Sequence, residues 1–281
     1  MANSISLATA FIPLLDEVYK EASLTSVLDG ASELVQQGAN ANELIIPKID
    51  MAGLADYSRN SGYVDGDVTL TNESVKCNFD RGRMFSVDSM DNIETAGIAF
   101  GQLAGEFIRT KVTPELDAFR FASYAGASGA DLTAGTYTDG KALIKAIATK
   151  ADGMTDAEVP QDGRYLFITA ANYGLIRDMD TTASRALIES FAGVIVVPGT
   201  RFYTAIEQTD NGYQKATDGK ALNFLIVHKD AVIQFEKHVA PKIVAPEANP
   251  DADAWKFGYR NVSIADVYEN KTAGIAGEYT A

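Results

Sequence analysis

One glycine-rich stretch has the outline of a phosphate-binding loop. Gly135, Gly140 and Lys141 follow the spacing of a loop whose backbone N–H groups and lysine hold nucleotide phosphates. The next residue is Ala142, however, where such a loop needs a serine or threonine to bind magnesium. No apolar strand precedes the stretch either. The sequence therefore argues against nucleotide binding, and an α/β nucleotide-binding enzyme is kept only as an alternative.

Other residue types that support catalysis or metal binding lack a suitable pattern. His228 and His238 lie ten residues apart without further ligands nearby, and Asp251 and Asp253 lack the regular carboxylate spacing of a calcium site. Cys77 is the only cysteine, which excludes an internal disulfide and a four-cysteine zinc site. The sequence contains no Gly-x-Ser-x-Gly motif. We therefore predict no catalytic, cofactor-binding or metal-binding residues, and a protein that is not an enzyme.

The composition argues against two classes of binding partner, nucleic acids and membranes. The net charge is −14, from 24 basic and 38 acidic residues, so the chain is poorly suited to gripping nucleic-acid phosphates. Hydrophobic residues make up 46% of the chain, enough for a substantial core. No apolar run approaches the ~20 residues of a membrane span, and no signal peptide opens the sequence. We expect a protein made in a reducing cytoplasm and not bound to a membrane.

The longest predicted element is a helix over residues 89–126. Its apolar positions recur with helical spacing from Ile93 to Val112. Thr113 and Pro114 form a second helix-start pattern, which predicts a break or kink before a shorter helix that ends at Gly126. Glycine occupies every fourth position at Gly97, Gly101 and Gly105. Each glycine costs roughly 0.5–1 kcal/mol relative to alanine, so we expect another backbone to pack closely on that stripe.

The segments before this helix differ in character. Residues 1–42 form an N-terminal arm with an amphipathic stripe, and residues 43–88 form a long polar β-hairpin. Pro47 lies in its first strand and predicts an edge position. In the second strand Val75, Cys77 and Phe79 alternate with polar residues. More than twenty residues rich in Gly, Asp, Asn and Ser separate the two, so the hairpin should project and contact something else.

The segments after the helix alternate and then become all strand. A flexible link over 126–140 follows the long helix and opens the next part of the chain, residues 127–235. This part then contains a helix over 141–150, strands over 164–169 and 194–197, and helices between these strands. This order predicts an α/β unit. Residues 236–281 contain only strands, and we expect them to return to the long helix as a sheet.

The order of these elements resembles the major capsid protein of tailed bacteriophages, the HK-ninety-seven fold. Four stretches are similar to parts of that family: Leu54–Tyr63 (LADYSRNSGY) to the tip of its extended loop, Asp80–Thr95 (DRGRMFSVDSMDNIET) to the passage into its spine helix, Pro160–Thr169 (PQDGRYLFIT) to the start of its axial domain, and Trp255–Lys271 to its C-terminal return. The resemblance covers nearly the whole chain. It implies an α+β fold with an N-terminal arm, an extended β-hairpin loop, a spine helix with a peripheral β-sheet, and an α/β axial domain.

The resemblance also implies a function. Such a protein assembles, in the cytoplasm of a bacterial host, into pentamers and hexamers of an icosahedral head shell, and it encloses double-stranded DNA without sequence-specific binding. Because the match begins near residue 1, the resemblance implies a separate scaffolding protein, besides a portal. Predicted intersubunit contacts are Tyr57, Arg59 and Tyr63 at the loop tip and Arg81 and Arg83 at its base. An encapsulin-like compartment shell is the alternative with the same fold.

Overall fold

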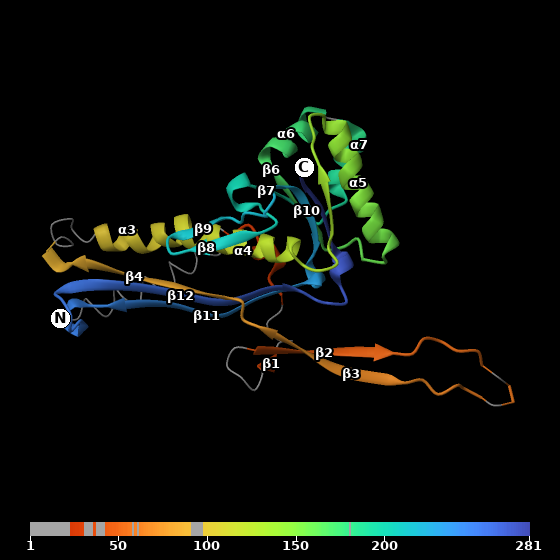
Figure 1. Ribbon diagram of the computed structural model, residues 1–281, viewed down its shortest axis with the longest axis horizontal. Coiled ribbons are helices and arrows are strands. Elements are labelled where there is room, and N and C mark those ends of the chain that lie inside the picture. Colours follow the sequence, from red (N-terminus) through yellow and green to blue (C-terminus); the bar gives the residue numbers. More distant parts are fainter. Residues whose placement is uncertain are drawn as a thin grey trace. The chain divides into compact units, whose positions relative to one another are not determined.

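The chain divides into two compact units. The computed structural model (Figure 1) describes residues 23–30, 36–37, 43–57, 59–60, 62–90, 98–179 and 181–281. The described residues of 31–78 form one unit, here called the loop unit. The described residues of 23–30 and 79–281 form the other, here called the body.

The loop unit is a long antiparallel hairpin with a short third strand. Strand β2 (Glu43–Met51) pairs with β3 (Val68–Lys76) along its full length. Strand β1 (Gln36–Gln37) pairs only with Leu44 and Ile45 of β2. Pro47 lies beyond that pairing and opposite Asn72 of β3, so among the described residues its other side has no neighbouring strand. The sequence pattern predicted an edge strand, and that prediction is wrong for β2 as a whole, which lies between β1 and β3; at Pro47 itself the described residues place a strand on one side only, which suits a residue with no N–H to offer a ladder.

The body contains a three-stranded antiparallel sheet in the order β11-β12-β4, here called the peripheral sheet. Its strands are β4 (Phe79–Asp88), β11 (Val232–Val244) and β12 (Ala254–Val267). The sequence pattern joined Val75 to Phe79 in one alternating strand, and that prediction is wrong. The alternation is interrupted at Cys77 and Asn78, where β3 of the loop unit gives way to β4 of the body. A period of two cannot reveal the division, because Val75 and Phe79 are both buried and the alternation keeps its phase from one strand to the next.

The long helix crosses the predicted break without stopping. It consists of α3 (Ile98–Phe107), a π-helical segment η3 (Ile108–Val112) and α4 (Thr113–Ala125). Ser89 and Met90 are also helical, whereas 91–97 lie outside the described residues. Thr113 has helical angles (φ −60°, ψ −47°) and does not cap α4; its hydroxyl donates to the carbonyl of Ile108, five residues back. A π turn therefore accommodates Pro114, whose ring would collide with the carbonyl four residues back in a regular α-helix.

The glycine stripe does not receive another backbone at the position that can be described. A Cβ added at Gly105 would meet nothing within 4 Å. The side-chain positions of Gly97 and Gly101 lie outside the described residues. Among the described residues nothing packs on Gly105, so the expected close packing is not found there and stays a prediction for the stripe.

The second sheet of the body, here called the axial sheet, has five strands in the order β5-β13-β10-β6-β7. They are β5 (Asp131–Gly135), β6 (Arg164–Thr169), β7 (Gly193–Val197), β10 (Leu222–His228) and β13 (Ile275–Thr280). The helices of this part are α5 (Gly140–Asp156), α6 (Ala170–Met179) and α7 (Thr182–Glu189). A small hairpin of β8 (Ile206–Thr209) and β9 (Gly212–Lys215) follows β7. The strands and helices predicted here are present, and Figure 1 shows helices beside the sheet.

Two predictions for this part are corrected. The link over 126–140 contains strand β5, which pairs in parallel with β13. The last strand, β13, lies between β5 and β10 in the axial sheet and does not join β11 and β12 as expected for all of 236–281. Its residues Ile275 and Ala276 are buried in the axial core. This packing, rather than local sequence, determines which strands β13 pairs with.

Helix α4 and the segments beside it connect the two sheets through apolar packing. Phe121 and Tyr124 pack in one core with Phe167 of β6 and Ala265 of β12. A second core lies between α3, η3 and the peripheral sheet, and a third lies between α5 to α7 and the axial sheet. No helix among the described residues is long and apolar enough to cross a membrane.

Candidate functional site

The tip of the loop unit exposes apolar side chains as a group. Tyr57 is 60% and Tyr63 88% exposed, and their ring centroids lie 4.9 Å apart in an edge-to-face arrangement. Arg59 lies between them in the sequence and is also exposed. Other large apolar side chains exposed on this hairpin are Met51, Leu54, Val64 and Val68. Single exposed apolar residues are ordinary, whereas several on one hairpin are the feature by which a candidate interaction surface is recognised.

The two arginines predicted at the base of the loop have partners within the body. Arg81 of β4 donates to Glu115 of α4 (Nε–Oε1, 2.8 Å) and to the carbonyls of Thr209 and Gly212. Arg83 donates to the carbonyl of Asp210 and to Asn211 Oδ1. Both side chains therefore hold the β8–β9 turn against β4. Their contact with a second subunit stays a prediction.

A cleft of about 1110 Å³ lies where these arginines hold the hairpin. Its walls are β4 from Phe79 to Phe85, the helix from Leu103 to Glu115, and the β8–β9 turn. Asn261 of β12 also lines it, and that side chain is only 1% exposed. Among the described residues neither Nδ2 nor Oδ1 of Asn261 has a hydrogen-bond partner. Buried amides without partners are rare in folded proteins, so this cleft differs from an ordinary surface hollow.

The glycines of the nucleotide-loop motif are explained by packing. A Cβ added at Gly135 would lie 2.3 Å from Glu278 Oε2, and one at Gly140 would lie 2.3 Å from the carbonyl oxygen of Leu175. Tyr137 donates to the same Glu278 carboxylate, and burial together with this bond raises the pKa of the tyrosine. The motif therefore brings β5 and α5 close to β13 and α6.

Replacing Gly140 with alanine is expected to lower the free energy of unfolding by about 1–3 kcal/mol, because the added methyl group must displace the backbone of α6. Gly153→Ala in the same helix is the matched control, since an added Cβ there meets nothing within 4 Å. Urea denaturation of both variants measures the difference. Equal stability of the two variants would contradict the packing explanation.

The histidines are not placed for metal binding. His228 is buried; its Nε2 lies 2.9 Å from the carbonyl of Asp162 and its Nδ1 accepts from the backbone N–H of Asp230. His238 is exposed on β11. In the part of the chain that the structure describes, no three His, Cys, Asp or Glu side chains gather as a metal site.

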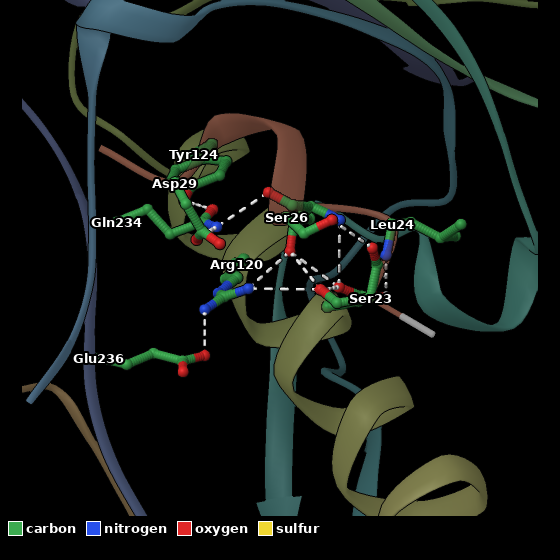
Figure 2. Close-up of polar contacts among 10 residues, drawn as sticks. Ser23, Leu24, Ser26, Asp29, Arg120, Tyr124, Gln234 and Glu236 are labelled. Atoms are coloured by element: carbon green, nitrogen blue, oxygen red, sulfur yellow. Dashed lines mark hydrogen bonds and ion pairs between the residues drawn. The ribbon is translucent and has the colours of Figure 1, made fainter. Parts of the chain in front are cut away.

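A buried polar network that the sequence analysis missed joins the end of the arm to the spine (Figure 2). Asp117 of α4 is fully buried and accepts from the Ser23 hydroxyl (2.9 Å), the Thr25 hydroxyl (2.8 Å) and the Leu24 N–H (3.1 Å). Arg201 of η4 (Gly199–Arg201) donates to Oδ2 of the same carboxylate (3.3 Å), the oxygen that also accepts from Leu24. The segment Ser23–Asp29 is thereby attached to α4.

The network continues to the peripheral sheet. Arg120, 1% exposed, donates to the Thr25 hydroxyl (2.9 Å) and to Glu236 of β11 (2.9 Å). Tyr124 donates to Gln234 (2.7 Å), whose amide donates to the carbonyl of Thr25 (2.8 Å). Burial raises the pKa of Tyr124, so the phenol remains a donor. A sequence signal was present: Asp117 and Arg120 lie on the stripe of α4 that buries Phe121 and Tyr124.

The fold was compared with known proteins. No family model and no curated protein sequence matches the chain. Among solved structures, one described as "Capsid structure of the Cyanophage P-SCSP1u" has a TM-score of 0.57 at 12% identity, and covers 88% of this chain and 85% of that one. This protein has the fold of a capsid protein.

Other structures extend the capsid fold to further sources. A structure from Gordonia phage Cozz has a TM-score of 0.62 at 12% identity and covers 92% of this chain and 86% of that one. A virus-like particle from Pyrococcus furiosus has a TM-score of 0.56 at 10% identity and covers 94% and 98%. The α+β capsid fold expected from the sequence resemblance is confirmed over most of the chain.

Proposed function

We propose that this chain is the major capsid protein of a tailed bacteriophage, and that it assembles into the icosahedral head shell around the genome. The observation that carries the proposal is the likeness to phage capsid structures over about nine-tenths of the chain. The separate loop unit with its exposed apolar tip also supports the proposal. Apolar side chains exposed to water raise the free energy of the protein, and contact with a partner surface would remove them from water. The protein is then a virion component and not an enzyme.

The proposed partners are copies of the same chain, arranged as pentamers and hexamers. A separate scaffolding protein and a portal complete the assembly, which takes place in the host cytoplasm. Double-stranded DNA is enclosed without being gripped. The net charge of −14 supports this last point, because an acidic lining repels phosphates and leaves DNA free to be packaged.

The proposed intersubunit contacts are Tyr57, Arg59 and Tyr63 at the loop tip. Tyrosine and arginine are enriched at protein interfaces because they combine a large apolar or planar surface with hydrogen-bonding groups. Arginine pairs well with carboxylates, which this chain has in excess. Arg81 and Arg83 support the contact from the base of the loop, where they also hold the β8–β9 turn.

The substitution Arg59→Glu tests the proposal. We expect it to reduce the yield of closed particles at least tenfold in negative-stain micrographs, because it replaces a basic group by a carboxylate in a chain that already has an excess of carboxylates, which favours repulsion between copies. The circular dichroism spectrum should not change, since the side chain is exposed. Arg59→Lys, which keeps the charge, should assemble. Normal shells from Arg59→Glu would show that this contact is dispensable.

The alternative with the same fold is a compartment shell that packages protein cargo, and the likeness to phage capsid structures does not favour it. The contents of particles purified from the natural source separate the two functions: double-stranded DNA supports a phage head, and a co-purifying enzyme supports a compartment. A nucleotide-binding enzyme is the third alternative. Calorimetry with nucleotides would detect it, and binding lost in Lys141→Ala would support it.

A further inference from the structure

We propose that Asn211, in the turn between β8 and β9, is a site of spontaneous deamidation, and that the carboxylate formed there pairs with Arg83 of β4. The modification needs only water and no enzyme. It replaces a neutral contact that holds the β8–β9 turn on β4 with an ion pair, so this hold tightens as the protein ages. The inference goes beyond the proposed function and does not depend on it. Three observations lead to it.

The first observation is the sequence of the turn. Asn211 is the only asparagine of the chain that is followed by a glycine. Asparagine is one of the thermolabile residues of proteins, and its side-chain amide can be attacked by the backbone nitrogen of the next residue. A glycine at that next position favours the attack, because it has no side chain to hinder the approach and its backbone is the most flexible.

The second observation is access to the reacting groups. Asn211 is exposed, so water reaches its amide. A Cβ built on Gly212 would meet nothing within 4 Å, so no neighbouring group crowds that side of the glycine. Gly212 has a φ of +135°, a conformation that residues with a side chain rarely adopt. Residues 210–211 form the turn itself, beyond the last strand pair of Thr209 with Gly212.

The third observation is the position of Arg83. Its Nη1 donates to Asn211 Oδ1 (3.3 Å), and its Nη2 donates to the carbonyl of Asp210. Negative charge develops on Oδ1 when the amide carbon is attacked, and a donor directed at such an oxygen stabilises the transition state. Neither of these partners of Arg83 carries a charge, so deamidation turns one of the two contacts into a charge-assisted one.

The reaction is balanced with water as the only co-reactant. The backbone nitrogen of Gly212 loses its proton and forms a bond to Cγ of Asn211. The bond from Cγ to the amide nitrogen breaks, and this nitrogen takes up a proton and leaves as ammonia. Water then adds to one of the two carbonyl carbons of the succinimide ring and opens it. The product at position 211 is aspartate or isoaspartate, and nothing is oxidised or reduced.

Peptide mapping by mass spectrometry tests the site on the wild-type chain, incubated at mildly alkaline pH. We expect Asn211 to deamidate at least tenfold faster than Asn270, because the residue after Asn270 has a side chain. Asn270 is the matched control, since it is also exposed and also lies in a turn. The ring route leaves isoaspartate beside aspartate at position 211, whereas direct hydrolysis of the amide leaves aspartate alone. Equal rates at the two residues, or aspartate alone, would overturn the site.

The substitution Asn211→Asp tests the pairing with Arg83. We expect it to raise the melting temperature by about 1–3 °C in low salt, the size of an exposed ion pair in a protein of this length. The rise should vanish in high salt, which screens exposed charges. It should also be absent when Asn211→Asp is made in an Arg83→Gln background, where the carboxylate has lost its partner. Asn270→Asp is the control and should give no rise.

The two experiments have separate outcomes. No rise for Asn211→Asp, or the same rise with and without Arg83, would overturn the ion pair. Neither experiment depends on assembly, so either failure leaves the proposed function standing. Fast deamidation with isoaspartate at position 211, together with a rise that needs Arg83, would establish both parts of the inference.

Discussion

Replacing Asp117 with alanine is expected to lower the free energy of unfolding by about 3–5 kcal/mol, the range seen when one partner of a buried ion pair is removed. The carboxylate is fully buried and accepts from two hydroxyls, a backbone N–H and Arg201. Without it these donors lose an acceptor where water has limited access, since both hydroxyls are buried and Leu24 and Arg201 are half-buried, and a group left without a partner there carries its own desolvation cost. Equilibrium denaturation in guanidinium chloride measures the loss.

Asp152→Ala is the matched control, because Asp152 is exposed on α5, and surface substitutions of this kind stay within about 0.5 kcal/mol. A second readout separates this contact from a general loss of stability. The variant should also release the arm: cleavage by a protease near Ser23–Asp29 should become faster under conditions where the body is still folded. If Asp117→Ala unfolds at the same denaturant concentration as the control, the network contributes nothing to stability.

Replacing Phe121 with alanine should lower the free energy of unfolding by about 3–5 kcal/mol, as expected when a large buried aromatic side chain leaves a cavity. Phe121 is fully buried, and its ring packs edge-to-face against Phe167 of β6 (5.1 Å) and Phe202 (5.0 Å). It thereby joins α4 to the axial sheet. The loss is measured by the denaturation midpoint at an unchanged slope.

Two further variants sharpen this prediction. Phe121→Leu keeps most of the apolar volume and should cost clearly less than Phe121→Ala. Phe119→Ala is a matched control on the same helix, because Phe119 is only partly buried. A cost for Phe119→Ala as large as that for Phe121→Ala would show that the core between helix and axial sheet is not the dominant one.

The sequence predicted elements well where one periodicity determines them. The helices predicted at 170–179 and 185–191 and the strands predicted at 164–169 and 194–197 are present, the second helix as Thr182–Glu189, because each has at least one buried face that its local pattern reveals. The change in the helix at Pro114 was predicted at the right place, since α4 begins at Thr113 with the proline in its first turn; the cap assigned to Thr113 was wrong, because the helix continues through a π turn. A π turn depends on the surrounding tertiary structure, so helix propensities of single residues do not predict it.

Contacts between residues far apart in the sequence could not be predicted from local pattern. The hairpin of β8 and β9 has few apolar residues, so the pattern of residues 206–215 did not predict it. Without this hairpin as a partner, Arg81 and Arg83 were predicted to contact a neighbouring subunit. The position of β13 in the axial sheet could not be predicted either, because its pattern of residues fits a strand of the axial sheet as well as one of the peripheral sheet. Asp117 and Arg120 show the opposite case: two charged residues on an apolar stripe indicate buried pairing, although the sequence could not name Ser23 and Thr25 as partners.

The position of β13 has a consequence for biosynthesis. This strand lies between β5 and β10, yet residues 275–280 are translated after every other strand of the axial sheet. While they are still inside the ribosome, β5 has no neighbour and one edge of β10 is unpaired. The axial sheet therefore stays incomplete until residues 275–280 have been made and have left the ribosome.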